Sequence, residues 1–96
     1  MTIKTIIELQ AKPGKRDELV KAMDAVLGSM KDAKGFLGMN RYEVIDNADS
    51  LIEITEWETA EARQAWLEQS MVTGSLNNLM GKLGVPFKAI TVRQMD

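Results

Sequence analysis

The sequence predicts an α+β protein with a ferredoxin-like βαββαβ order of elements and an antiparallel sheet. Three observations favour this class. Strand-like and helix-like stretches follow one another in that order, and a polar turn joins the two middle strands into a hairpin. The third observation is the size of the chain. A chain of 96 residues with 45% hydrophobic residues is sufficient for one core, so we expect a single domain spanning residues 1–96.

The first strand and the first helix are predicted from the apolar pattern near the N-terminus. The stretch TIKTIIELQ, residues 2–10, is rich in β-branched side chains that roughly alternate with polar ones, which is typical of a strand. Pro13 and Gly14 then form a turn signal. From Lys15 to about Lys31, helical spacing separates four apolar residues, Leu19, Met23, Val26 and Met30. Gly35 ends this segment.

The middle of the chain predicts a β-hairpin. The stretch GFLGMNRYEVID, residues 35–46, has the composition of a second strand. Residues 47–50 are polar and suit a turn, and LIEITEWE, residues 51–58, follows as a third strand. Because only this short turn separates the two strands, we expect them to pair with each other.

Two helical pieces and a last strand complete the predicted order. Thr59 is a suitable N-cap, with Glu61 near the positive end of the helix dipole, and this helix is expected to run to about Gln69. A second helical piece is predicted from the spacing of Val72, Leu76, Leu79 and Leu83. Gly84 is expected at its C′ position, Pro86 prevents its continuation, and FKAITVRQ, residues 87–94, is the last strand.

The third predicted strand has apolar side chains on both faces. Alternation directs Leu51 and Trp57 to one side, and Ile52 and Ile54 to the other. A strand of this kind is expected to be covered on both faces, yet the helices of one chain cover only one face of the predicted sheet. A second copy packed sheet against sheet would cover the other face, so we predict a homodimer.

The net charge and the length of the apolar runs limit the kinds of partner that the protein is expected to bind. A net charge of −2 and a pI near 5.1 disfavour nucleic-acid binding, which needs a concentrated basic face. No apolar run is long enough to span a bilayer, and the N-terminal stretch has no apolar h-region, so we expect a cytoplasmic protein without a membrane partner.

The chain contains no histidine and no cysteine, which limits the chemistry available to it. Catalytic triads, thiolate nucleophiles and the usual zinc and haem ligands all require one of these residues. Acid–base chemistry near neutral pH must then come from a carboxylate, lysine or tyrosine with a shifted pKa, or from the substrate itself.

Three stretches carry a resemblance to a known family. KPGKRDEL, GFLGMNRYEV and EWETAEARQAW together resemble the antibiotic biosynthesis monooxygenase family of dimeric α/β-barrel proteins, and the resemblance covers nearly the whole chain in the same order. It implies a dimer with a pocket between the sheet and the helices of each subunit. It also implies a family that includes cofactor-independent oxygenases of phenolic or quinol substrates and haem-degrading enzymes.

The resemblance to the cofactor-independent members can be followed residue by residue. Their pocket tryptophan at the end of the third strand matches Trp57. Four residues earlier they have a substrate-binding asparagine, and this chain has Glu53. Six residues after the tryptophan they have a pocket tyrosine, and this chain has Arg63.

The resemblance to the haem-degrading members is carried by Trp66, which matches a helix tryptophan that contacts the porphyrin. Their asparagine on the first strand corresponds to Ile7, and their histidine ligand falls close to Ser75. No histidine elsewhere in the chain replaces that ligand.

Two charged residues are candidates for catalysis. Glu53 shares its strand face with Trp57, so burial would raise its pKa and suit it to take a proton from a phenolic hydroxyl. By analogy with the paired positions of the family, Arg63 on the facing helix is the expected partner of Glu53, and it would stabilise the developing anion. The alternative is a structural ion pair without chemistry.

The candidate substrate-binding residues are Trp57, Trp66 and Asn40. The two tryptophans would form an aromatic wall suited to a flat, apolar ligand, and the alternative for each, favoured for Trp66, is a core residue. Alternation places Asn40 and Tyr42 on one face of their strand and Arg41 on the other. Either set could contact a ligand or the partner subunit, or lie on the surface.

The resemblance, together with the two charged residues, implies a cofactor-independent monooxygenase that acts on a small aromatic or quinol-like molecule, with no cofactor or metal expected. One alternative is a haem-binding or haem-degrading protein. Another is a catalytically silent module that binds a small ligand, and a third is an isomerase or lyase, because one fold supports several reactions.

Overall fold

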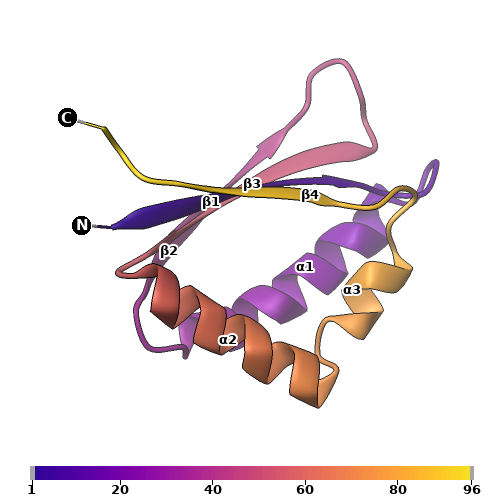
Figure 1. Ribbon diagram of the computed structural model, residues 1–96. Helices are drawn as coiled ribbons and strands as arrows, with labels where there is room; N and C mark the ends of the chain where they lie inside the picture. Colours follow the sequence, from indigo (N-terminus) through magenta and orange to yellow (C-terminus); the bar gives the residue numbers. More distant parts are fainter. Residues whose placement is uncertain (1, 96) are drawn as a thin grey trace.

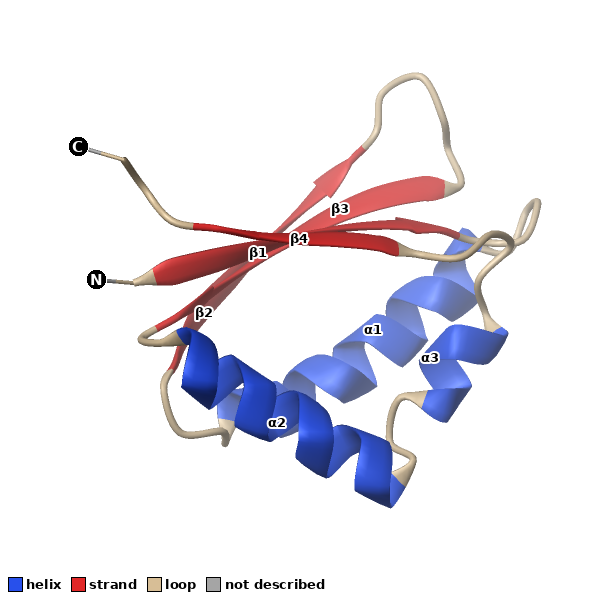
Figure 2. Cartoon of the chain, viewed as in Figure 1, coloured by secondary structure: helices blue, strands red, loops and turns tan. Residues whose placement is uncertain are grey.

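The computed structural model describes residues 2–95, which form a four-stranded antiparallel sheet and three helices (Figure 1; Figure 2). The elements are β1 (Ile3–Gln10), α1 (Arg16–Lys31), β2 (Phe36–Glu43), β3 (Ser50–Trp57), α2 (Ala60–Thr73), α3 (Asn77–Gly81) and β4 (Lys88–Val92). The ferredoxin-like βαββαβ order predicted from the sequence is confirmed, with α3 as a short additional helix before β4.

The sheet has the order β2-β3-β1-β4, so β1 and β3 are its central strands. Their register places Ile3 opposite Trp57 and Ile7 opposite Glu53. On the other side of β1, Ile7 lies opposite Ala89 of β4. Because partners in a sheet share a face, Glu53, Ile7 and Ala89 form one row across the sheet. The β2–β3 hairpin contains a bulge between Phe36 and Gly38.

All three helices lie on the same side of the sheet (Figure 1; Figure 2). The four apolar residues predicted to share one side of α1 are all buried: Leu19, Met23, Val26 and Met30. They pack against the helix-facing residues of the central strands, which include Leu9, Leu51 and Trp57. The core therefore lies between the sheet and α1, as the helical spacing predicted.

The other face of the sheet is bare in the described part of the chain. The alternation predicted for β3 is confirmed, because Leu51 and Trp57 are 3% and 1% exposed, whereas Ile52 and Ile54 are only partly buried. On the same bare face, Ile90 is 60% exposed and Tyr42 is 50% exposed. Among the described helices, none combines the length and the apolar character that a bilayer span requires.

The boundaries of the C-terminal helices differ from the prediction. Thr59 caps α2 as expected, accepting a hydrogen bond from the Ala62 N–H at 3.0 Å. However, α2 continues to Thr73 and ends at Gly74, whose left-handed φ of 73° allows its N–H to bond the Ser70 carbonyl. Val72 therefore belongs to α2 and is 87% exposed, so its assignment to the second helical piece was wrong.

Gly84 is required by a close approach and not by a helix end, because α3 already ends at Gly81. Its N–H donates a hydrogen bond to the Gln10 carbonyl at 2.8 Å. A Cβ at this position would lie 2.8 Å from the Ala11 carbonyl oxygen, which is closer than van der Waals contact allows. The segment before β4 can therefore reach the end of β1 only if residue 84 has no side chain.

We expect Gly84→Ala to lower the free energy of unfolding by about 1–3 kcal/mol, since the backbone must shift to accept the methyl group. Gly28→Ala is the matched control. A Cβ at Gly28 meets nothing within 4 Å, and replacing glycine inside an exposed helix position should stabilise the fold by up to about 1 kcal/mol. Urea unfolding measures both, and equal effects of the two substitutions would contradict the close approach at Gly84.

Candidate functional site

A cavity of about 200 Å³ lies between the sheet and the helices. Six residues line it from the strands: Ile7, Leu9, Glu53, Thr55, Trp57 and Ala89. Eight line it from the helices: Met23, Val26, Met30, Arg63, Trp66, Leu67, Leu79 and Met80. Its wall is mainly apolar and aromatic, with one carboxylate and one guanidinium, which is the composition typical of a small-molecule site.

Trp57 forms a fixed part of this wall. It is 1% exposed, and its indole N–H donates to Thr55 Oγ1 at 3.1 Å. Phe36 packs against the ring edge-to-face, with centroids 5.3 Å apart. The Trp66 ring lies 5.9 Å away at an interplanar angle of 40°. The two tryptophans predicted from the sequence are thus in contact, one from β3 and one from α2.

Trp66 also borders a second space. Its indole N–H donates to Ser29 Oγ of α1 at 3.3 Å, which ties the two helices together. The ring lines both the cavity and a wide groove of about 640 Å³ on the outer surface between the end of α1 and the start of α2. Neither Glu53 nor Arg63 lines that groove. We therefore place the candidate site in the smaller, inner cavity.

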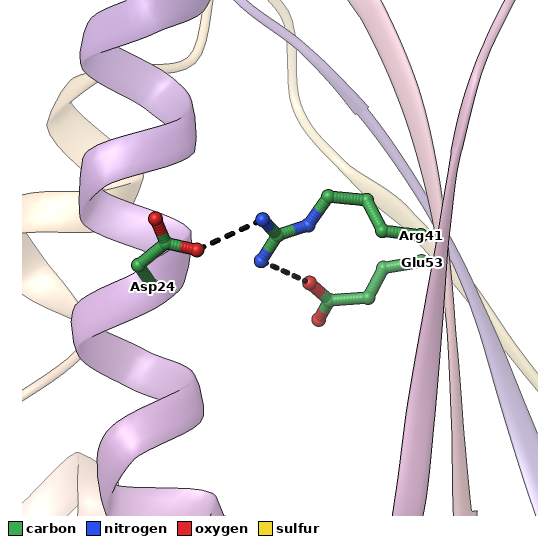
Figure 3. A network of polar contacts seen from close by, with 3 residues as sticks. All are labelled: Asp24, Arg41 and Glu53. Carbon is green, nitrogen blue, oxygen red and sulfur yellow. Dashed lines mark hydrogen bonds and ion pairs between the residues drawn. The ribbon is translucent and has the colours of Figure 1, made fainter.

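Glu53 is buried on the helix-facing side of the sheet, as predicted, but its partner is not the one expected. The Arg41 guanidinium Nη2 lies 3.3 Å from Glu53 Oε2, and Arg41 Nη1 lies 2.8 Å from Asp24 Oδ1 of α1 (Figure 3). The predicted pairing of Glu53 with Arg63 was wrong. Arg41 satisfies the carboxylate instead and joins β2, β3 and α1 in one polar network.

The register of the hairpin explains this pairing. Arg41 and Glu53 lie directly opposite each other in the β2–β3 ladder, and both point toward the helices. Each is six residues from Asn47 in the turn, so folding the predicted hairpin about that residue would have identified the pair. The error came from transferring a pair of positions from the family in place of the local register.

Burial raises the pKa of the Glu53 carboxyl above its ordinary value, since the loss of hydration outweighs the attraction of the Arg41 guanidinium. The side chain of Arg41 is 22% exposed and that of Glu53 is 9% exposed, so water screens this pair only weakly. A carboxylate with a raised pKa in an apolar cavity is the arrangement that enzymes use for a general base.

Arg63 lines the cavity from the first turn of α2 and is partly buried. Within residues 2–95 it makes no ion pair, and burial lowers the pKa of its guanidinium below the ordinary value. The cavity therefore holds a cationic side chain whose charge no carboxylate of the described chain balances.

Asn40 does not join this site. It lies opposite Ile54 of β3 on the bare face of the sheet, where it borders a hollow together with Tyr42 and Lys4. Ser75 lies in the turn between α2 and α3, where its N–H donates to the Ser70 carbonyl at 3.1 Å. Ile7, by contrast, lines the cavity. Across residues 2–95, the structure has no cluster of three or more acidic, histidine or cysteine side chains suited to a metal ion.

The sequence profile of the antibiotic biosynthesis monooxygenase family matches residues 2–73. The chain therefore belongs to this family. None of the curated proteins compared with the chain is similar enough in sequence to match it.

Solved structures with the same fold cover nearly the whole chain. A conserved protein from Methanosarcina mazei Go1 has a TM-score of 0.87 at 16% identity and covers 99% of this chain and 94% of its own. A candidate antibiotic biosynthesis monooxygenase from Bordetella bronchiseptica has a TM-score of 0.85 at 13% identity, with 98% and 97% covered. SnoaB, a cofactor-independent oxygenase from Streptomyces nogalater, has a TM-score of 0.80 at 16% identity, with 98% and 95% covered.

We expect Arg41→Met to lower the free energy of unfolding at neutral pH by about 2–3 kcal/mol, because it leaves the Glu53 carboxylate without its charged donor. The sign of the pH dependence follows from the raised pKa. Below the ordinary glutamate pKa of about 4.3, Glu53 is protonated in both the folded and the unfolded protein. The loss of stability in Arg41→Met therefore appears as the pH rises through the pKa of Glu53 in the folded protein. The difference from the wild type should therefore shrink from about pH 8 to about pH 4.5.

Arg16→Met is the control for this measurement. Arg16 pairs with Glu43 at 3.1 Å on the surface, where the two side chains are 37% and 68% exposed, so its loss should cost less than about 1 kcal/mol. Urea unfolding across the pH range measures both variants. A pH-independent loss in Arg41→Met, or an equal loss in Arg16→Met, would show that Glu53 does not depend on Arg41.

Proposed function

We propose that the protein is a cofactor-independent monooxygenase of a small aromatic or quinol-like substrate. The observation that supports this most is the inner cavity, where two indole rings in contact share a wall with a buried carboxylate and with a guanidinium that no carboxylate of residues 2–95 pairs. Family membership and the fold shared with SnoaB support the same class of reaction.

In this proposal Glu53 is the general base. Arg41 engages its Oε2, and no hydrogen bond from residues 2–95 engages Oε1, which leaves that oxygen to accept the proton of a phenolic hydroxyl. Burial adds to the driving force, because a raised pKa brings the carboxylate closer to the pKa of a phenol. Arg63 would face the anion that forms and stabilise it in a mainly apolar space.

The reaction balances without an added reductant. A hydroquinone loses a proton to Glu53, and its phenolate transfers one electron to O₂. The two radicals combine in a C–O bond at a ring carbon, which gives a hydroperoxide. Cleavage of its O–O bond, with loss of the hydrogen on that carbon, leaves one oxygen on the ring and releases the other as water. The substrate supplies all four electrons and becomes a hydroxyquinone.

We also propose that the functional form is a homodimer, closed by packing the bare sheet faces of two copies together. This face carries the exposed apolar residues Ile90 and Tyr42 beside the partly buried Ile6, Ile52 and Ile54. An apolar surface of this extent on a sheet is expected to be covered by a partner. A second copy offers the same surface, as a two-fold symmetric interface requires.

The haem alternative receives less support from the site. An engineered apolar cavity of about 150 Å³ holds one benzene ring, so a space of about 200 Å³ suits one substituted ring and not a porphyrin of four pyrroles. Ser75, at the position of the histidine ligand in haem-degrading relatives, is not among the residues that line the cavity.

Replacement of the base tests the proposed reaction. We expect Glu53→Gln to lower the rate of oxygen consumption with an active hydroquinone by about 10²-fold or more, because amide oxygen is a much weaker base. The control is Glu68→Gln, at an exposed position of α2. An oxygen electrode and product chromatography, over a panel of hydroquinones, catechols and anthrones, measure the effect. Unchanged turnover in Glu53→Gln would remove Glu53 from the mechanism, and no uptake with any compound would contradict the oxygenase.

The proposed dimer can be tested by a charge placed at its centre. We expect Ile54→Lys to shift the protein from dimer to monomer, because the lysine would be buried without a partner in the closed interface. Ile45→Lys is the control, since Ile45 is 92% exposed in the loop between β2 and β3. Light scattering measures the molar mass. A wild-type protein that is monomeric at micromolar concentration would contradict the proposed interface.

A further inference from the structure

We infer that the cavity binds a single-ring aromatic anion, a phenol that also carries a carboxylate, and that Arg63 holds the carboxylate. This inference rests on the proposed function for its premise that the cavity receives an aromatic molecule. It adds the size and the charge of that molecule, which neither the family nor the similar structures specify.

The size of the ligand follows from the volume of the cavity. The space measures about 200 Å³, against about 150 Å³ for an apolar cavity that accommodates benzene. The difference leaves room for two small substituents on one ring. Pockets for drug-sized ligands measure about 300 Å³ or more, so this cavity lies below that range and favours one ring over larger fused systems.

The charge of the ligand follows from Arg63. Arg41 already contacts two carboxylates, those of Glu53 and Asp24, so the carboxylate of Glu53 has a cationic partner. Arg63 has no such partner within residues 2–95, although it is partly buried beside mainly apolar side chains. A desolvated charge is costly unless it is paired, and a planar carboxylate fits the two parallel N–H donors of a guanidinium.

The position of Arg63 lets one molecule use both the cation and the aromatic wall. Arg63 and Trp66 are three residues apart in α2, so they lie on the same side of that helix, and both line the cavity. Trp66 contacts Trp57, which is four residues from Glu53 on the same strand face. A carboxylate at Arg63 would place the aromatic ring against the indoles.

The same arrangement orients the ligand. An ionised Glu53 repels a second carboxylate, so the ligand carboxylate is expected at Arg63 and the phenolic hydroxyl near Glu53. The hydroxyl is then the group that loses a proton in the proposed reaction. Within residues 2–95, the charged groups that act on Glu53 are Arg41 from β2 and Asp24 from α1, while Arg63 from α2 lines the same cavity.

The test compares 4-hydroxybenzoate with 4-hydroxybenzamide, which has nearly the same shape but no charge. Calorimetry and quenching of tryptophan fluorescence measure both dissociation constants. We expect the wild type to bind the acid at least about tenfold more tightly than the amide, as for a charge-assisted hydrogen bond. Arg63→Gln should abolish this preference. Arg16→Gln, which removes a guanidinium from a surface ion pair, should keep it.

Several results would overturn the inference. Equal binding of acid and amide to the wild type would do so, as would an acid preference that persists in a folded Arg63→Gln variant. Tighter binding of 1,4-dihydroxy-2-naphthoate, a two-ring acid, would contradict the single-ring assignment. The far-ultraviolet spectrum and the urea midpoint of each variant establish that it is folded.

Oxygen consumption separates this inference from the proposed function. An acid preference that depends on Arg63, without oxygen uptake, would leave the inference standing and contradict the monooxygenase. Oxidation of neutral hydroquinones that bind as tightly as the acids would support the monooxygenase and contradict the inference. Failure of all these compounds to bind would contradict both.

Discussion

The register of β3 between β1 and β2 is the constraint on which the site depends. Successive side chains of a strand point to opposite faces, so a shift of one residue would turn Glu53 and Trp57 to the bare face. Ile52 and Ile54 would then meet the helices. The pairs formed by Trp57 with Ile3 and by Glu53 with Arg41 hold the strand in the observed register. The aromatic wall and the buried carboxylate thus have one common structural cause.

In this register the protein buries the Glu53 carboxylate and places a cationic partner, Arg41, beside it. Glu53 is next to Arg41 on the adjacent strand, and Arg41 extends across to Asp24 on α1 (Figure 3). A buried carboxylate without such a donor would destabilise the fold. The compensation is incomplete, because the loss of hydration still raises the pKa of Glu53.

Much of the fold and part of the site could be predicted from the sequence because both follow local periodicity. The spacing of Leu19, Met23 and Val26 predicted the buried side of α1, and alternation placed Glu53 and Trp57 on one face. The end of α2 was missed because the stretch around Val72 continues the helical spacing, while the left-handed Gly74 decides the boundary. The role of Gly84 depends on the distant carbonyl of Ala11, which no local pattern contains.

The partner of Glu53 was missed although the turn at Asn47 gives the hairpin register that identifies it.

The two edges of the sheet have a consequence for aggregation. One edge strand, β2, is interrupted by a bulge, and the other, β4, has only five residues and begins with a lysine. Short, bulged or charged edges are poor templates for another strand, so further copies cannot easily add side by side into a growing fibril. In the proposed dimer, each copy would cover the bare apolar face of the other. Self-association would then stop at two copies and would not continue along the sheet edges.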